Sequence, residues 1–519
     1  MRIIDAPVPR AGRGSALVRS TVSLISAGTE RQIIDLSRAS LAGKALARPD
    51  LVQQTVRKMK TEGVLPTVRK VFNKLDTPIP LGYSVAGEVI ETAQDCGVCV
   101  RDRVACAGAG VANHAEFNSV PKNLMVRIPD AVSNEDASFV TLGAIALQGV
   151  RITQPTLGER VVVMGLGLIG LLTVQILKAN GCRVLGFDPN PERVKLAIRL
   201  GADLAVSNDL PGACEAFTAG YGADAVIVTA SSKSSEPLNQ AADISRMRGR
   251  VVVVGLVGMD IERDAFYKRE LELRLSMSNG PGRHDPAYEK EGRDYPLPFV
   301  RWTQARNMEA FLELIEQGRV TPSDLVTHRF AITDAESAYG LMDGDEPYLA
   351  ILLEYPDSRA APARSVEMNR NAKPVANTGD AISFIGFGNY AKSMLVPALP
   401  ASHKNKLHTV VTSTGISAHS AAEKAGFANA ATDPEEVFSD GATSTVFIVT
   451  RHDSHASLTK RALSAGKAVF VEKPLALTHE DLDEVIAAAR SGNRILTVGF
   501  NRRFAPMTLE AREFLSGRN

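Results

Sequence analysis

The chain has 519 residues, which is enough for two to four domains. Its 59 basic and 58 acidic side chains give a net charge of +1, so no strongly basic surface for nucleic acid or an anionic membrane is expected. Five scattered cysteines, an N-terminus without an apolar run and no stretch of ~18 apolar residues exclude a disulfide framework, a signal peptide and a spanning helix, which favours a soluble cytoplasmic protein.

The first 147 residues are predicted to be rich in β-structure. Short apolar segments flanked by turn residues occupy 15–26, 82–91 and 102–108. A basic amphipathic stretch at residues 40–74 interrupts them, and its basic run at 57–60 indicates a solvated helix face.

From about residue 158 the pattern changes to apolar strands that alternate with helices. The strands are RVVVMGL, CRVLGFD, DAVIVTA and GRVVVVGL, and the alternation predicts a parallel sheet. Residues 356–379 are polar, rich in Ala and Pro and without periodicity, which predicts an interdomain linker. The alternation then restarts with AISFIGFG, LHTVVTS, STVFIVT and AVFVEKP.

A glycine-rich turn directly follows the first of these strands. Gly165 permits a tight turn, Gly167 lets the backbone approach a pyrophosphate, and Gly170 allows close packing of helix on strand. The helix that begins at Leu168 and Ile169 would direct its N-terminal amides and its dipole at the phosphates. This pattern predicts a dinucleotide site.

An acidic residue ends the next strand. Asp188 lies eighteen positions after Gly170, where a carboxylate binds the hydroxyls of the adenosine ribose, and Arg193 follows it. Since a carboxylate repels a 2′-phosphate, NAD(H) is favoured over NADP(H) at this first site. The alternative is a glycine-rich loop that binds no nucleotide.

Residues 1–355 resemble the medium-chain dehydrogenase/reductase superfamily, to which zinc alcohol and polyol dehydrogenases belong. Besides the glycine-rich turn, the matching segments are LGYSVAGEVIE, RDRVACAG, HAEFNSVPKNLMVRIPD and GRVVVVGL. The resemblance implies a GroES-like catalytic domain at 1–147, completed by about 290–355, and a Rossmann NAD-binding domain at 148–289. It also implies an active site in the cleft between these domains.

The chain departs from that family where catalytic zinc is held. The family has Cys, His, and Cys or Glu at the positions of Ser26, Tyr83 and Thr141. Hydroxyl groups are poor replacements for thiolate, imidazole or carboxylate ligands. Cys96 and Cys99 form a C-x-x-C pair, but no fourth ligand follows at a suitable spacing. We therefore predict no metal site and no zinc.

Without a Lewis acid, a side chain must polarise the substrate carbonyl and move the proton. Tyr83, at the vacated histidine position, is the candidate that would face the nicotinamide and donate a hydrogen bond or proton. Glu30 or His114 would orient Tyr83 or relay the proton. The alternatives are a packing role for the Tyr83 ring and a structural hydrogen bond for His114.

The segment 278–303 combines Gly and Pro turns with Arg, His, Asp, Tyr and the single Trp. Because it follows a sixth predicted Rossmann strand, it would fall near the cleft. Arg283 and Arg301 are therefore candidates for binding substrate hydroxyls or an anionic group. The alternative is a stiff surface loop with satisfied local hydrogen bonds.

The glycine-rich design is repeated after the predicted linker. Gly386 and Gly388 follow a strand, and Ala391 takes the third glycine position. Asn389 and Tyr390 complete the turn, so these five residues form the predicted second cofactor-binding turn. The predicted fold class is therefore α/β, in which a GroES-like β-rich domain and a Rossmann domain are linked to a second Rossmann domain.

Farther along, the strand AVFVEKP ends in Glu472, Lys473 and Pro474. With a T-x-H-x-x-H segment before it, VGFNRRF after it and the glycine-rich turn, it resembles the Gfo/Idh/MocA family of sugar and inositol dehydrogenases. The resemblance covers 381–519. It implies that Lys473 lies beside the nicotinamide and the substrate carbon, where an ammonium helps to shift the proton of the reacting hydroxyl. Glu472 and Pro474 are carried over as cofactor-binding residues.

This half departs from the family in two ways. The strand LHTVVTS ends without an acidic residue, so NAD(H) and NADP(H) both stay open as the second cofactor. The family also places a second α/β domain after its Rossmann domain, whereas this chain stops at Asn519 and starts in what looks like the middle of its first strand. We therefore expect a gene fragment or a truncated two-enzyme fusion, whose 380–519 domain binds dinucleotide but catalyses poorly.

The order of the two halves resembles bacterial bi-domain oxidoreductases associated with surface-polysaccharide synthesis, which implies a sugar or sugar-nucleotide substrate. We predict an NAD(H)-dependent oxidoreductase acting on an alcohol or ketone carbon of a small carbohydrate-like molecule, with a homo-oligomer as the default assembly. One alternative is a dinucleotide-binding sensor or scaffold without catalysis. The other is a zinc alcohol dehydrogenase with displaced ligands.

Overall fold

The computed structural model describes residues 1–38, 57, 78–357, 361–368, 380–492 and 494–516. The chain forms two compact units. The first unit contains the described residues 1–3, 11–38, 57 and 79–357, and the second contains 4–10, 78 and those from 361 onward. The basic stretch predicted at 40–74 lies, apart from Arg57, outside the described residues.

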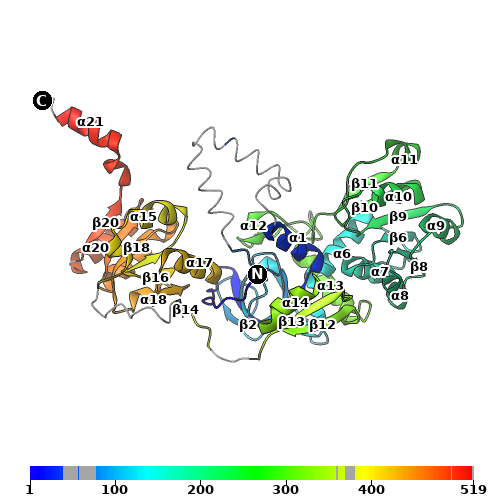
Figure 1. The fold of residues 1–519 in the computed structure, drawn as a ribbon, viewed down its shortest axis with the longest axis horizontal. Helices are drawn as coiled ribbons and strands as arrows, with labels where there is room; N and C mark the ends of the chain where they lie inside the picture. Colours follow the sequence, from blue (N-terminus) through cyan, green and yellow to red (C-terminus); the bar gives the residue numbers. More distant parts are fainter. Residues whose placement is uncertain (39–56, 58–77, 358–360, 369–379, 493, 517–519) are drawn as a thin grey trace. The chain divides into compact units, whose positions relative to one another are not determined.

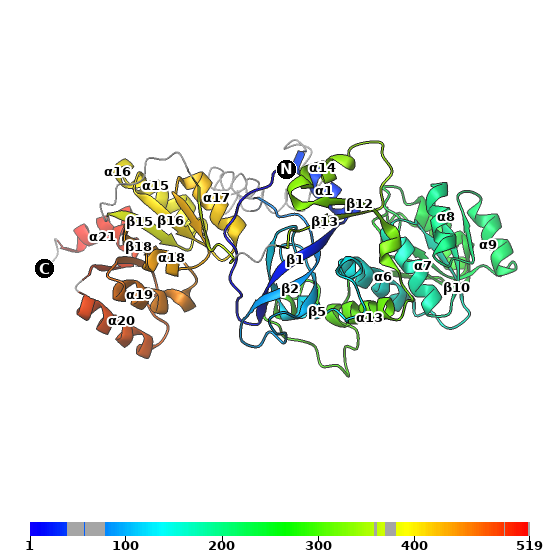
Figure 2. The same ribbon diagram turned by 90° about the horizontal axis from the view of Figure 1, so that it is seen from below.

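A seven-stranded, mainly antiparallel sheet forms the β-rich part of the first unit. Its strands are, in spatial order, β12 (Val326–Ala331), β13 (Ala350–Glu354), β1 (Ser15–Ile25), β2 (Ser84–Thr92), β3 (Arg103–Ala107) and β5 (Met125–Arg127), with β4 (Phe117–Pro121) paired to β1. Figure 2 shows β1 and β2 side by side. The chain therefore forms the second sheet of this unit first and then returns to the first sheet through β12 and β13.

The second sheet of this unit is parallel and has six strands. In spatial order these are β8 (Leu204–Val206), β7 (Arg183–Phe187), β6 (Arg160–Met164), β9 (Ala223–Val228), β10 (Ser245–Val253) and β11 (Glu272–Leu275). This is the doubly wound Rossmann order, and the expected sixth strand is β11. β6 and β9 are continuous apolar runs because a central parallel strand is covered on both faces.

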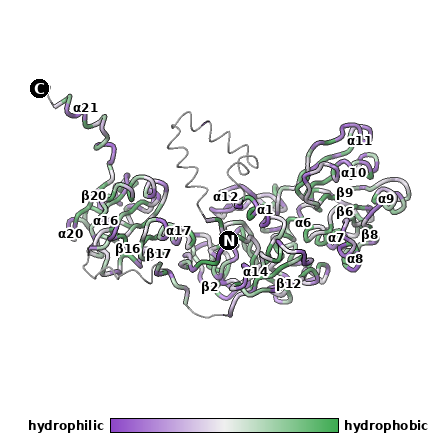
Figure 3. Tube along the Cα trace, viewed as in Figure 1, coloured by the Kyte–Doolittle hydropathy of each residue, from purple (hydrophilic) through white to green (hydrophobic). Residues whose placement is uncertain are grey.

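Helices cover this sheet and complete the first unit (Figure 1). They are α1 (Ala27–Arg38), α5 (Asn134–Ala137), α6 (Val140–Thr153), α7 (Leu168–Ala179), α8 (Pro191–Arg199), α9 (Leu210–Thr218), α10 (Glu236–Ile244), α11 (Arg263–Lys268), α12 (Pro286–Glu289), α13 (Gln304–Glu316) and α14 (Ala335–Leu341). α8 starts at Pro191 because the Asn190 side chain caps it by accepting a hydrogen bond from the Glu192 amide. Figure 3 shows the outer helices α8 and α11 as mainly hydrophilic.

The second unit is another Rossmann-type sheet with helices (Figure 1). Its strands are, in spatial order, β14 (Ser365–Glu367), β17 (Asn429–Ala431), β16 (Leu407–Val411), β15 (Ala381–Ile385), β18 (Thr443–Ile448), β19 (Ala468–Glu472) and β20 (Leu496–Gly499). All pair in parallel except β14, which is antiparallel to β17. Its α-helices are α15 (Val396–Ala398), α16 (Ala401–Lys404), α17 (Gly415–Ala425), α18 (Glu435–Phe438), α19 (His455–Ser464), α20 (His479–Gly492) and α21 (Pro506–Ser516).

Two expectations about the chain's course were wrong. Residues 356–379 were expected to be a linker, but β14 lies within them and pairs with β17. The N-terminus was expected to begin inside the first strand, whereas β1 starts at Ser15 and residues 4–10 belong to the second unit. There the Val8 amide donates to the carbonyl oxygen of Ala363 at 2.8 Å, and the Thr432 hydroxyl donates to the Val8 carbonyl.

Apolar side chains fill the space between each sheet and its helices. In the first unit one cluster joins Val161 and Val163 of β6, Leu171 of α7 and Phe311 of α13. In the second unit the aromatic rings of Phe384 and Phe447 stack in the core. No helix in the described part of the chain combines the length and the apolar character that crossing a bilayer requires.

Candidate functional site

The turn between β6 and α7 has the geometry that a dinucleotide needs. Gly165 has a φ of +97°, and a Cβ atom added to it would lie 2.7 Å from the Ala230 amide nitrogen. A Cβ added to Gly170 would lie 1.9 Å from the Gly165 carbonyl oxygen, so helix and turn are in direct contact there. At Gly167, in contrast, no atom lies within 4 Å of an added Cβ. The backbone is thus open where a pyrophosphate would approach α7.

Asp188 stands at the end of β7 and is fixed by the main chain. Its Oδ2 accepts a hydrogen bond from the Leu166 amide at 2.8 Å, and its Oδ1 accepts one from the Asn190 amide at 2.9 Å. Arg193 Nη1 lies 3.4 Å from Oδ2. Each carboxylate oxygen keeps lone-pair capacity for a further donor such as a ribose hydroxyl. The predicted residues Gly165, Gly167, Leu168, Ile169, Gly170, Asp188 and Arg193 therefore lie at one end of the sheet.

Small residues at the ends of β9 and β10 also belong to this region, and the sequence analysis missed them. The Thr229 hydroxyl donates to the Gly165 carbonyl at 2.5 Å, so the end of β9 fixes the glycine-rich turn. A Cβ added to Gly255, after β10, would lie 2.0 Å from the Ala230 carbonyl oxygen. The sequence contained a signal for them: the segments TASS and GLVG follow β9 and β10, as the glycine-rich turn follows β6.

Ser26, Tyr83 and Thr141, at the three positions that hold zinc in the family this unit resembles, lie close together. The Tyr83 hydroxyl donates to Ser26 Oγ at 2.5 Å, and the Thr141 hydroxyl donates to the Tyr83 carbonyl at 2.9 Å. Tyr83 packs against the apolar cluster that contains Leu166, and Leu168 and Ile169 pack against the same cluster. Burial raises the pKa of Tyr83, and the nearby charge of Glu30 acts in the same direction. The phenol is therefore a hydrogen-bond donor at neutral pH.

Glu30 is fully buried and contacts the main chain of Ser26 rather than the Tyr83 hydroxyl. Its Oε1 accepts from the Ser26 amide at 2.9 Å, and its Oε2 faces His114 Nε2 at 3.2 Å and the hydroxyl of Tyr339. Burial alone would raise the pKa of Glu30, but the charge and hydrogen bond of His114, with Tyr339 and Ser26, outweigh it and hold the pKa below its ordinary value. Glu30 thus stays an anion inside the unit.

His114 continues this network away from Tyr83. Its Nδ1 lies 2.7 Å from Ser23 Oγ, which shares a 2.8 Å hydrogen bond with the Tyr355 hydroxyl. Burial is the main cause that raises the pKa values of Tyr355 and Tyr339. Ser23, Tyr339 and Tyr355 were not predicted. Tyr339 and Tyr355 lie far from Glu30 in the sequence, and Ser23 is one of several serines in and beside β1 that no pattern distinguishes.

Arg283 and Arg301 both have partners within the first unit. Arg283 Nη1 lies 2.6 Å from Glu289 Oε1 in an ion pair. The Arg301 guanidinium stacks at 3.8 Å from the centroid of Trp302, and Arg151 stacks on the same ring at 3.2 Å. Burial, with the charge of Arg301, lowers the pKa of Arg151 to about 10. These contacts fit the structural alternative, and substrate binding by Arg283 and Arg301 stays a prediction.

The second glycine-rich turn repeats the first in the second unit. Gly386 has a φ of +89°, and its added Cβ would lie 2.5 Å from the Val449 carbonyl oxygen. No atom lies within 4 Å of a Cβ added to Gly388, and Ala391 is buried. Asn389 and Tyr390 begin the helical segment that follows the turn, and the Tyr390 hydroxyl accepts a 2.5 Å hydrogen bond from Asn501 Nδ2.

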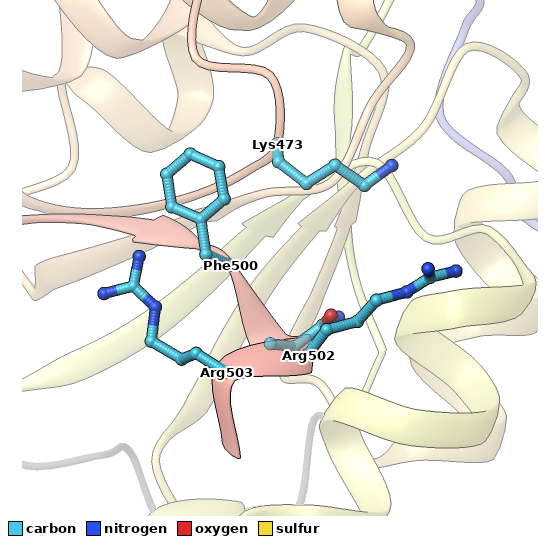
Figure 4. A pocket seen from close by; sticks show the side chains of 5 residues that line it. Lys473, Phe500, Arg502 and Arg503 are labelled. Atoms are coloured by element: carbon cyan, nitrogen blue, oxygen red, sulfur yellow. The ribbon is translucent and has the colours of Figure 1, made fainter. Parts of the chain in front are cut away.

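Glu472 is the last residue of β19, and Lys473 and Pro474 follow it at the same end of this sheet. Glu472 is buried, whereas Lys473 is exposed and lines an open cavity of about 370 Å³. The buried His455 holds the following segment, since its Nδ1 lies 2.7 Å from the Pro474 carbonyl oxygen. Figure 4 shows Lys473 at this cavity, with Phe500, Arg502 and Arg503 labelled beside it.

Two family models match the chain on either side of the predicted linker. Residues 169–289 match the family described as "Zinc-binding dehydrogenase". Residues 381–500 match the GFO_IDH_MocA family, described as "Oxidoreductase family, NAD-binding Rossmann fold". The chain joins a zinc-type alcohol-dehydrogenase-like unit to a Gfo/Idh/MocA Rossmann domain. Both families are oxidoreductases, which confirms the predicted enzyme class.

Two relatives of the alcohol-dehydrogenase-like unit are named for a guloside and for sorbitol. D-Guloside 3-dehydrogenase of Shigella flexneri is 27% identical over 269 residues, which cover 50% of this chain and 72% of that protein. Sorbitol dehydrogenase of Halalkalibacterium halodurans is 24% identical over 311 residues, covering 53% and 83%. Among solved structures, alcohol dehydrogenase TADH from Thermus sp. ATN1 matches with a TM-score of 0.50 at 19% identity, covering 68% of this chain and 98% of that chain. The structural match shows the shared α/β fold alone.

A zinc site of the usual kind is not found in the alcohol-dehydrogenase-like unit as far as the structure describes it. Nowhere in the described ranges do three or more His, Cys, Asp or Glu side chains form a group that could hold a metal ion. Ser26, Tyr83 and Thr141 instead offer neutral hydroxyl groups, which bind zinc poorly.

Proposed function

We propose that the alcohol-dehydrogenase-like unit is an NAD(H)-dependent oxidoreductase acting on an alcohol or ketone carbon of a sugar-like small molecule. The observation that carries this proposal is Asp188, fixed by two amides beside the open backbone at Gly167. The bound nicotinamide would supply or accept the hydride. The names of the guloside and sorbitol relatives support the substrate class. A role in polysaccharide synthesis stays a prediction from the resemblance.

We infer NAD(H) for the first site from charge. The Asp188 carboxylate can accept hydrogen bonds from the 2′- and 3′-hydroxyls of the ribose, but it repels a 2′-phosphate. Arg193 lies 3.4 Å from this carboxylate, and an arginine that already faces a carboxylate is a weaker phosphate receptor. For the second site both NAD(H) and NADP(H) stay proposed, because Thr412 and Ser413 follow β16 and neither is acidic.

In this proposal Tyr83 replaces the metal as the group that polarises the carbonyl. Its raised pKa keeps the hydroxyl protonated, so its single proton can be donated to a substrate oxygen when that oxygen replaces Ser26 Oγ as the acceptor. Ser26 accepts from Tyr83 and thereby sets the direction of the phenol. Glu30 and His114 would act as positioning residues, because Glu30 binds the Ser26 amide rather than either hydroxyl. A direct proton relay from Tyr83 to Glu30 is therefore not part of the proposal.

Calorimetric titration of NADH and NADPH into the full chain tests the cofactor proposal. Gly167→Asp and Gly388→Asp are a matched pair, because both glycines have room for a side chain and each change puts a carboxylate in the path of one pyrophosphate. Wild type should bind two dinucleotides, and each variant should bind one. Asp188→Ala should reduce the preference of the first site for NADH, while Glu192→Gln on the exposed start of α8 should not. A first site without binding would refute the proposal.

A dinucleotide-binding sensor or scaffold is the second candidate, and the hydroxyl residues at the metal positions favour it. A panel of sugar alcohols, sugars and sugar nucleotides, followed by NADH absorbance, separates the two functions. Turnover of any panel member supports the enzyme, whereas cofactor binding without turnover supports the scaffold. Stoichiometric zinc in the purified protein would instead support the zinc alcohol dehydrogenase alternative.

A further inference from the structure

Residues 4–10 form part of the second unit, although the chain that follows them forms the first. By its contacts this segment belongs to the second unit, whereas residues 11–38 belong to the first. Pro7 and Val8 within the segment are buried. Figure 2 shows the dark blue start of the chain beside α17. A stretch from the far end of the sequence therefore completes this Rossmann-type unit.

One half of the segment follows the first turn of α17. His419 Nδ1 lies 2.9 Å from the Asp5 carbonyl oxygen. One turn nearer the start of the helix, a Cβ atom added to the buried Gly415 would lie 2.1 Å from the Pro7 carbonyl oxygen. The three atoms nearest to that added Cβ all belong to Ala6 and Pro7. The segment is thus in direct contact with the first residue of α17.

The other half of the segment is held by the strands at the edge of the sheet. The Val8 amide donates to the Ala363 carbonyl oxygen at 2.8 Å. Thr432 directly follows β17, and its hydroxyl donates to the Val8 carbonyl oxygen. Arg10 then forms a 3.0 Å ion pair with Asp433. These contacts fix the segment between the start of α17 and the end of β17.

This place in the fold is the adenosine end of the second cofactor site. The glycine-rich turn follows β15, and β16 is the neighbouring strand. A pyrophosphate at that turn places the adenosine ribose at the end of β16, where residues 412–414 connect the strand to α17. The Thr414 hydroxyl caps α17 by accepting a hydrogen bond from the Ser417 amide at 3.4 Å. The ribose loop is therefore tied to the helical turn that Pro7 contacts.

We propose that residues 5–8 are a positioning segment of the second cofactor site, which holds the start of α17 and the loop 412–414 in place for the adenosine half of the dinucleotide. This inference rests on the proposed second cofactor site and adds a part of it that comes from the other end of the chain. A loop already held in its bound shape loses less conformational entropy when the ligand binds. The segment therefore raises the affinity of the second site without contacting the nicotinamide half.

Calorimetric titration of ADP-ribose and NADH into the Gly167→Asp protein, in which only the second site should bind, tests this inference. Removing residues 1–10 should weaken both ligands about tenfold and by the same factor, because both contain the adenosine half. Removing residues 1–3 should change neither affinity. Unchanged affinity after the longer deletion would overturn the inference. A larger loss for NADH than for ADP-ribose would also overturn it, because the effect would then lie at the nicotinamide half.

The Gly415→Ala variant tests the same contact without removing any of the chain. Its Cβ collides with Pro7, so the affinity for ADP-ribose should fall about fivefold or more in the full-length protein. The same substitution should have no effect once residues 1–10 are removed. Gly441→Ala, whose Cβ meets no atom within 4 Å, is the matched control and should change nothing. Equal effects of Gly415→Ala with and without the segment would overturn the inference.

The stoichiometry separates this inference from the cofactor proposal on which it rests. One ADP-ribose per Gly167→Asp chain supports the second site itself, whereas no binding would refute that site and this inference together. A stoichiometry that stays at one in the variants shows that the second unit is folded, so a changed Kd reports the segment. If the longer deletion lowers the stoichiometry, Gly415→Ala and Gly441→Ala in the full-length protein decide. A loss of affinity in the first variant alone supports the inference, and equal affinities overturn it.

Discussion

The Tyr83 hydroxyl donates a 2.5 Å hydrogen bond to the Oγ atom of Ser26. Ser26 directly follows β1, and Tyr83 directly precedes β2. They occupy two of the positions that hold zinc in the family that this unit resembles. A hydroxyl pair held in place by Glu30 and Thr141 can donate to a carbonyl oxygen without a metal. This geometry leads to the first prediction.

Replacing Tyr83 with Phe should lower kcat by about 100-fold with the best substrate of the panel, because the ring is kept while the proton donor is lost. Affinity for NADH should not change, since Asp188 and the glycine-rich turn are untouched. Steady-state kinetics and cofactor titration measure the two effects. Tyr221→Phe, at an exposed tyrosine, is the control. Full turnover by Tyr83→Phe would assign the ring a packing role only.

Replacing Glu30 with Gln should destabilise the first unit by about 2–4 kcal/mol at pH 7, because a buried anion with three partners is lost. The exposed pair of His328 and Glu346 is a matched control, since both pairs join His to Glu at similar distances. Glu346→Gln should cost less than about 1 kcal/mol. Denaturant unfolding at neutral pH measures both, and equal costs would show that the Glu30 network contributes no special stability.

The same carboxylate predicts how stability depends on pH. The folded protein holds the pKa of Glu30 below its ordinary value of 4.5, so the unfolded chain binds this proton more readily. The stabilisation is fully present above pH 4.5 and is lost as the pH falls below that value through the folded pKa. Thermal unfolding between neutral pH and pH 3.5 should therefore show a steeper loss for wild type than for Glu30→Gln. Parallel curves would contradict the assignment.

Two glycines of the first turn should differ sharply when changed to Ala. Gly170→Ala puts a Cβ 1.9 Å from the Gly165 carbonyl oxygen and should cost at least about 2 kcal/mol, with loss of NADH binding. Gly167→Ala meets no atom within 4 Å and should keep the fold. Thermal unfolding and NADH titration of both variants provide the comparison. Equal stability of the two variants would show that the contact at Gly170 can relax.

Residues 4–10 should be required for the stability of the second unit. Removing residues 1–10 deletes the Val8 hydrogen bonds and the 3.0 Å ion pair of Arg10 with Asp433, whereas removing residues 1–3 deletes neither. Hydrogen exchange in β14 and β17 should increase in the first deletion only. Unchanged exchange after removal of residues 1–10 would mean that the segment lies on the unit without stabilising it.

The sheets and the two glycine-rich turns could be predicted because their signals are local. Continuous apolar runs mark β6 and β9 as central parallel strands, and the glycine spacing marks the turn that follows. The same logic located Asp188 at the end of β7. The residues that form these features lie close together along the chain, within about two strands and the helix between them. A local sequence pattern is therefore enough to predict them.

The rest of the candidate site depends on contacts between distant segments. Glu30 meets Tyr339, 309 residues away, and no periodicity connects the two. Glu30 or His114 was expected to orient Tyr83 or relay its proton, but the structure shows that Glu30 contacts the Ser26 amide instead of the phenol. The short strand β14 could not be predicted within a stretch rich in Ala and Pro, because its three residues are ordered by pairing with the distant β17.

The edge of the second sheet has a practical consequence for dissecting this chain. β14 covers the open side of β17, and residues 4–10 pack beside it. A fragment that starts at Ala381 would lack both, and β17 would present unpaired amides and carbonyls of the kind that promote aggregation between chains. Expression of the second cofactor domain by itself should therefore retain β14 and supply residues 4–10, either as a separate peptide or through a circularly permuted chain.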